Sequence, residues 1–482
     1  MELTQRYRDK FWTAIVCLVV SLGSAWVVSI GGLIAGVAIL GLVLSLGILL
    51  FIFNNYRDGF LLLLLYGFFM FHIYRMLPAS PASFPMGTIV EILLVLISIS
   101  ILLHQTNDGH LNAGFYKNPI SLALLMFSSY TILLLFHPLS AAITGRILAV
   151  REIVMLLLLY FISIHVFRTY SFIYRFAGVW IFLALMAALY GIYQEVFGLQ
   201  SWELKWLYSG PDHGRLAIIW GHIRKWSFLS DINAFGLLMS YSGLVCLVLA
   251  LGPIHYAKKI FLIGCSLLMF ISMTFSGTRT AMAMVVFGLV FYIVATLNRK
   301  TSLAVLVAFS IGMLALFYGP FYGPNFNRLR STFSGSKDPS MNMRDNTRER
   351  MQPYVRLHPL GGGLNTTGVL GLKYDPSHEL AGNWDTDSGY LKTALERGWV
   401  GLLIQLGLYA TIMIYGLKFF YSTRDPIAAS YCCAYLTGFF ALTVANYAQD
   451  ALDQKPMNII VMGSIASIIG LYTLNKNNKC DA

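Results

Sequence analysis

Residues 234–252 read Ala-Phe-Gly-Leu-Leu-Met-Ser-Tyr-Ser-Gly-Leu-Val-Cys-Leu-Val-Leu-Ala-Leu-Gly, a run without any charged side chain. A helix of about 20 apolar residues is long enough to cross the hydrocarbon core of a bilayer. Similar runs recur from one end of the chain to the other. The sequence therefore predicts an all-α protein, a bundle of helices that crosses a membrane many times.

The composition excludes a soluble globular protein. Of the 482 residues, 57 % are hydrophobic and only 12 % are charged, whereas soluble domains carry about 25 % charged residues. The net charge of +12 does not indicate nucleic-acid binding, because the basic residues lie between apolar runs and form no stripe on a polar domain. The six cysteines show no metal-binding spacing and no disulfide framework, so we expect free thiols.

Hydropathy predicts about 12–14 spans. The candidates lie near 11–30, 33–53, 59–78, 86–104, 118–136, 148–167, 176–196, 234–252, 260–276, 280–298, 301–318, 399–420, 427–446 and 456–474. The basic segment 1–10 precedes about forty apolar residues, which is longer than a signal peptide, so we predict an uncleaved first span. Placing both termini in the cytoplasm puts Lys or Arg in every inner segment, as the positive-inside rule requires.

This topology predicts two long hydrophilic loops on the outer face. We divide the chain into an N-terminal transmembrane bundle (1–196), a first outer loop with the following spans (197–318), a long extracytoplasmic loop with short helices (319–398) and C-terminal spans (399–482). A loop of some 80 residues among short connections is usually functional.

Arginines gather in these outer segments. They are Arg215 and Arg224 in the first loop, Arg279 at the mouth of a span, and Arg344 and Arg348 in the long loop. An arginine near the bilayer is costly and indicates an anion to bind, and the planar guanidinium grips phosphate oxygens in pairs. A lipid-linked diphosphate fits this pattern, although loop arginines are also often merely solvated.

Five motifs follow one another on the predicted outer face. They are Arg-Lys-Trp-Ser-Phe followed by Asp-Ile-Asn-Ala-Phe-Gly (224–236), Thr-Arg-Thr (278–280), Arg-Asp-Asn-Thr-Arg (344–348), Leu-His-Pro-Leu-Gly-Gly-Gly (357–363), and Asp-Ser followed after nine residues by Gly-Trp-Val-Gly (387–401). Their order resembles the O-antigen ligase and O-antigen polymerase superfamily of bacterial envelopes, over residues 215–420. Ligases of that family carry His where this chain has Asp387, which favours a repeat-unit polymerase.

The resemblance implies a membrane glycosyltransferase of the bacterial cytoplasmic (inner) membrane. It implies an inverting, metal-independent transfer without cofactor, from an undecaprenyl-diphosphate-linked oligosaccharide to a sugar hydroxyl. Arg224, Arg279 and Arg344 would hold the diphosphate, with Arg215 and Arg348 as second choices. Other partners would be membrane lipids and a chain-length regulator, with no nucleic acid.

The catalytic base implied by the resemblance is Asp387, with Asp385 and His378 behind it. A carboxylate within hydrogen-bond reach of a hydroxyl can take its proton. Two alternatives remain open from the residues. Asp387 or Ser388 is also placed to cap the helix that follows, and the Asp385–Asp387 pair mimics a metal-binding Asp-x-Asp motif, without a nucleotide-binding fold around it.

Several smaller features have two interpretations. Gly361–Gly363 form a tight turn more plausibly than a phosphate cradle, and His358 packs or caps a helix end. Glu91 and Glu152 line a polar pocket or mark span ends. Four tryptophans of the first loop stack on sugars or sit at the membrane interface; they are Trp202, Trp206, Trp220 and Trp226. Rival functions are an O-antigen ligase, a flippase for the same lipid-linked sugars, and a non-catalytic scaffold.

Overall fold

The computed structural model describes residues 41, 43, 45–76, 86–108, 116–139, 143–210, 214, 217–219, 221–297, 303–307, 310–312, 314, 339–382 and 387–480. The predicted span 11–30, the first part of 33–53, most of 301–318, Arg215, Asp385 and Trp220 lie outside these residues. Arg344 lies inside a helix, but its side chain is not among those described.

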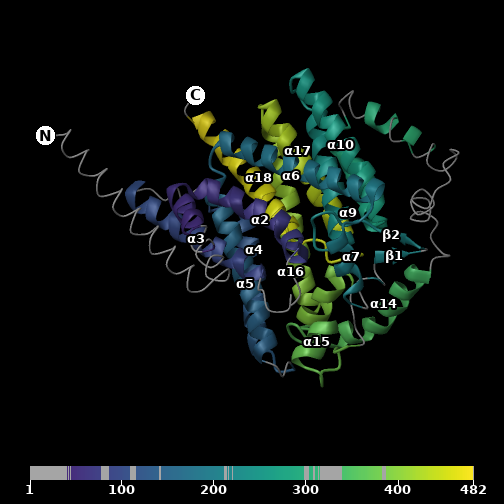
Figure 1. Ribbon diagram of the computed structural model, residues 1–482. Coiled ribbons are helices and arrows are strands. Elements are labelled where there is room, and N and C mark those ends of the chain that lie inside the picture. Colours follow the sequence, from purple (N-terminus) through teal and green to yellow (C-terminus); the bar gives the residue numbers. More distant parts are fainter. Residues whose placement is uncertain are drawn as a thin grey trace, which may run out of the picture.

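The described chain is a bundle of helices, which confirms the predicted all-α membrane fold (Figure 1). Among the described residues, ten helices are long and apolar enough to cross a membrane. They are α2 (Tyr56–Met76), α3 (Met86–Asp108), α4 (Pro119–Leu133) with the 3₁₀ turn η3 (Leu134–Phe136), α5 (Ile143–Val166), α6 (Tyr170–Phe197), α9 (Ile232–Ala250), α10 (Tyr256–Ser276), α16 (Gly389–Ser422), α17 (Pro426–Ala445) and α18 (Met457–Cys480). Helix α11 (Arg279–Ala295) is apolar but shorter.

The remaining elements lie in the two predicted outer loops. The first loop contains α7 (Ser201–Tyr208) and a small antiparallel hairpin of β1 (Ile218–Ile219) and β2 (His222–Ile223). The long loop contains the polar helix α14 (Pro339–Leu357) and the short helix α15 (Gly368–Tyr374). Figure 1 shows α14 and α15 at the same end of the bundle as the start of α16.

Helix α9 is the centre of the bundle. It packs against α6, α10, α11 and α17, and nearly all of its residues are buried, as expected for a helix that is apolar all round. The Asp231 side chain caps its start by accepting hydrogen bonds from the amides of Asn233 and Ala234. A Cβ at Gly236 would lie 2.6 Å from the Ser276 hydroxyl, so only glycine lets α9 approach the end of α10 this closely.

The first outer loop is anchored by a buried arginine of α2. The Arg75 guanidinium donates to the backbone carbonyls of Leu229 and Ser230 and lies over the rings of Trp206 and Trp226, 4.6 and 5.6 Å from their centroids. Trp226 is itself buried. These two tryptophans therefore pack the loop onto the bundle, and their ring faces are occupied by a cation of the protein.

Candidate functional site

Two of the predicted diphosphate-binding arginines meet at the junction of α10 and α11. Helix α10 ends at Ser276, Gly277 takes a left-handed conformation (φ +56°), and Arg279 is the first residue of α11. The Arg224 guanidinium donates to the Ser276 carbonyl at 2.6 Å and to the Thr278 hydroxyl at 3.1 Å. Arg224 is thus held against the residue that precedes Arg279, although the two arginines are more than fifty residues apart in the sequence. Both are half-buried and lie at the start of a helix, where the backbone dipole also favours an anion.

Arg348 and Asp387 lie beside a second junction, at the end of α17. Arg348 of α14 donates to the Tyr447 carbonyl at 3.2 Å, and its guanidinium stacks 4.0 Å above the Tyr447 ring. The backbone amide of Gly389, at the start of α16, donates to the Asn446 carbonyl at 3.1 Å. Asp387 is exposed and directly precedes this contact. Arg344 belongs to the same helix, four residues before Arg348.

The packing of α11 on α17 brings the two junctions to one end of the bundle. The two helices run in opposite directions: Phe291 stacks on Phe440 with ring centroids 4.8 Å apart, and Gly288, three residues earlier in α11, faces Ala441, one residue later in α17. The start of α11, with Arg279, and the end of α17, which leads to Tyr447, therefore point to the same end of the bundle. In this register Arg279 lies about 10 Å beyond the last turn of α17 along the bundle. Arginines from three separate motifs lie at this end.

The structure distinguishes the helix cap from the candidate base. The Ser388 hydroxyl accepts a hydrogen bond from the Leu391 amide and donates to the Asn446 carbonyl, so Ser388 is the N-cap of α16. Asp387 is not the cap, and its residue type is not explained by capping. His378, the other described candidate, uses Nδ1 to accept from the Leu380 amide at 3.1 Å in the turn after α15.

The glycine-rich turn holds α14 against α16. The amides of Gly362 and Gly363 donate to the carbonyls of Leu395 and Glu396 at 2.8 and 3.1 Å, so they are not available to a phosphate. This confirms the predicted tight turn. His358 stacks on Tyr354 and its Nδ1 contacts the Tyr354 carbonyl at 3.0 Å, which confirms a packing role.

A polar cavity lies behind the start of α16, and the sequence predicted it only in part. It is enclosed by α4, α5, α16, α18 and the segment between α17 and α18, and its volume is about 110 Å³. Its charged lining residues are Glu152, Lys392, Glu396, Arg397, Asp450 and Asp453. An adjoining cavity of about 310 Å³, between α2, α3, α5 and α18, shares Glu152 and adds Glu91. Both glutamates therefore line a polar pocket, as one of the two sequence interpretations had it.

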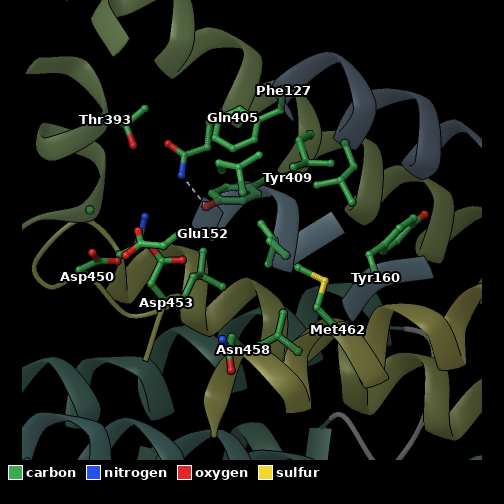
Figure 2. A pocket seen from close by; sticks show the side chains of 18 of the residues that line it. Phe127, Glu152, Tyr160, Thr393, Gln405, Tyr409, Asp450, Asp453, Asn458 and Met462 are labelled. Atoms are coloured by element: carbon green, nitrogen blue, oxygen red, sulfur yellow. Dashed lines mark hydrogen bonds between the residues drawn. The ribbon is translucent and has the colours of Figure 1, made fainter. Parts of the chain in front are cut away.

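The charges of the cavity are partly paired. Lys392 contacts Asp450 at 3.4 Å, and the buried Glu396 carboxylate accepts a hydrogen bond from Thr367 at 2.7 Å. Burial and then the neighbouring Asp453 raise the pKa of Asp450 to about 6, against the opposing effect of Lys392. Figure 2 shows Glu152, Asp450 and Asp453 at one end of the cavity and Tyr160 and Met462 at the other.

These features define a polytopic membrane protein with a cationic site and an acidic cavity at one end of its bundle. Residues 264–406, from α10 into α16, match the family described as O-antigen ligase. This match confirms the resemblance to the O-antigen ligase and polymerase superfamily. No curated protein matches the chain.

Proposed function

We propose that the protein transfers a glycan from undecaprenyl diphosphate to a sugar hydroxyl and so polymerises the repeat units of a surface polysaccharide. The observation that carries the proposal is the arginine site at the α10–α11 junction, at the same end of the bundle as Arg348 and Asp387. Arg279, Arg348 and Asp387 lie within the region that matches the O-antigen ligase family, and Arg224 precedes that region. Guanidinium groups at a helix start are suited to a diphosphate.

The reaction assigns separate roles to the two junctions. The acceptor hydroxyl oxygen forms a bond to the anomeric carbon while the bond from that carbon to the diphosphate oxygen breaks. The proton of the hydroxyl passes to the Asp387 carboxylate. Arg224, Arg279 and Arg344, with Arg348, neutralise the charge that develops on the leaving diphosphate. Attack on the face opposite the leaving group inverts the anomeric configuration, and no metal is needed where arginines hold the diphosphate.

The runner-up is an O-antigen ligase, which would pass the glycan to a different acceptor. Asp387 in place of a histidine favours the polymerase. A flippase would need cations in the middle of its spans, whereas Arg279 starts a helix and Arg348 belongs to a helix of the outer loop. We place the protein in the bacterial inner membrane with both termini cytoplasmic and the α14–α15 loop outside. A chain-length regulator would be its natural protein partner.

The test is a transfer assay with purified protein and the host's undecaprenyl-diphosphate repeat unit. Arg279→Ala and Asp387→Ala should abolish the product, each through loss of a different role. Arg356→Ala is the matched control, because Arg356 is an exposed arginine in the last turn of α14. A ladder of products supports a polymerase, and a single transfer to an added acceptor supports a ligase. Lipid movement across vesicles without any product would refute the proposal in favour of a flippase.

A further inference from the structure

The cavity behind α16 has the shape and polarity of a ligand site rather than of a packing defect. Its volume of about 110 Å³ exceeds what one ordered water needs. Its charged groups come from α5, the start of α16 and the 446–456 segment. Glu152 lies within the apolar helix α5, where an ionisable side chain is costly and is usually retained for function. The mechanism proposed above uses none of them.

Some polar atoms of the lining lack hydrogen-bond partners in the described structure. They are Gln405 Oε1, Asn458 Oδ1 and Arg397 Nε, and all three are shielded from solvent. An unsatisfied buried polar atom costs about 1–3 kcal/mol, so such atoms call for a ligand or water.

Aromatic side chains complete the walls. Gln405 donates through Nε2 to the Tyr409 hydroxyl at 2.7 Å, and Phe127 lies close to this pair in Figure 2. Apolar walls with a few convergent polar groups are the usual lining of a small-molecule site. A sugar ring, with hydroxyl edges and apolar faces, suits such walls.

The charge of the cavity excludes the donor diphosphate. The lining carries four carboxylates and two cations, Lys392 and Arg397, so its formal charge is −2. The adjoining cavity adds Glu91 and Lys455, which cancel. The arginine site at the α10–α11 junction has the opposite sign. An anion entering the cavity meets a net charge of its own sign, whereas a neutral or cationic group does not.

We infer that this cavity is the acceptor subsite, which receives the saccharide to be glycosylated and favours a neutral or amino sugar over a uronic acid. The specificity-determining residues are Asp450 and Asp453, with Glu152 facing them from α5. The acceptor role rests on the proposed transfer, but sugar binding and its charge preference can be measured without any transfer.

The test is a binding titration of the full-length protein in nanodiscs at low salt and pH 7. The probes are the methyl glycosides of glucose, glucosamine and glucuronic acid, which share one ring and differ in charge. We expect the glucosaminide to bind about tenfold more tightly than the glucuronide. Asp450→Asn combined with Asp453→Asn should bring this ratio close to one, while Glu379→Gln, an exposed carboxylate outside the cavity, should leave it unchanged.

If the double variant does not fold, Asp453→Asn alone serves as the test, because Asp453 is exposed and its replacement should be tolerated. This single change should lower the ratio of glucosaminide to glucuronide affinity about threefold. Equal binding of the three probes, or tighter binding of the glucuronide, would overturn the inference. So would a working transfer assay in a protein that binds none of them. A charge preference that depends on Asp453, in a protein without transfer activity, would support the cavity and refute the proposed function instead.

Discussion

Gly398 in α16 packs against the backbone of the glycine-rich turn, and replacing it with alanine should disrupt this contact. Its backbone has φ +70° and ψ 177°, a region that only glycine occupies readily. A Cβ at this position would also overlap the carbonyl oxygen of Pro359, which is backbone and has no rotamer through which to move away. The family's Gly-x-x-Gly spacing thus has a steric reason here.

The magnitude follows from these two costs. The strained backbone costs about 1–3 kcal/mol in a residue with a side chain. Forcing an extra carbon into a packed site adds about 1–3 kcal/mol more. Gly398→Ala should therefore lose about 2–6 kcal/mol of folding free energy, and transfer activity should fall with it, because α14 and its arginines are held through this turn.

Gly407→Ala is the matched control on the same helix. A Cβ at Gly407 meets nothing within 4 Å, and alanine is the better helix former by up to about 1 kcal/mol. Thermal unfolding of the two purified variants, followed by tryptophan fluorescence, makes the comparison. If Gly398→Ala unfolds at the temperature of the wild type or of Gly407→Ala, the steric account of this contact is wrong.

Three further predictions concern single groups. Asp387→Asn should abolish transfer at unchanged stability. Ser388→Ala should retain transfer but lower stability by about 1 kcal/mol, because the N-cap of α16 is lost. Transfer activity and melting curves of both variants would separate the role of the base from that of the cap. Because the folded state holds the Asp450 proton up to about pH 6, the wild type should gain stability relative to Asp450→Asn as the pH falls from 7.5 to 5, and parallel melting curves would contradict this. Arg75→Met should cost about 2–3 kcal/mol and expose the first outer loop to proteolysis, since the buried Leu229 carbonyl and the part-buried Ser230 carbonyl lose a charged donor. An unchanged digestion pattern would argue against the anchor.

The fold was predictable because it depends mainly on the hydropathy of consecutive residues, which can be read directly from the sequence. Long apolar runs in a bilayer must satisfy their backbone hydrogen bonds internally, and a helix does this regardless of its neighbours. The same reasoning predicted that the polar segment with α14 is not a span, and α14 is not among the membrane-spanning helices of the described chain. Hydropathy did not resolve whether Asp387 or Ser388 caps α16, because that depends on which side chain turns back to the Leu391 amide.

The cavity was less predictable for a physical reason. Lys392 and Asp450 are 58 residues apart, and only the packing of the 446–456 segment on α16 brings them to 3.4 Å. Hydropathy flagged Glu152 because a carboxylate inside an apolar run is anomalous on its own. Asp450 and Asp453 fall in a short loop between two spans, where acids are ordinary, so nothing in the sequence distinguishes them from solvated residues.

The segment after α17 connects the two oppositely charged regions. Tyr447 contacts Arg348 on the arginine side, and Asp450 contacts Lys392 on the cavity side. The buried Asn446, directly before Tyr447, accepts from Gly389 and Ser388 through its carbonyl and from the Ala451 amide through its side chain. These bonds fix the start of α16, and with it the backbone beside Asp387, against both regions. A transfer reaction requires donor and acceptor to be held at a set distance, and in the reaction proposed above the bonds of Asn446 would fix that distance.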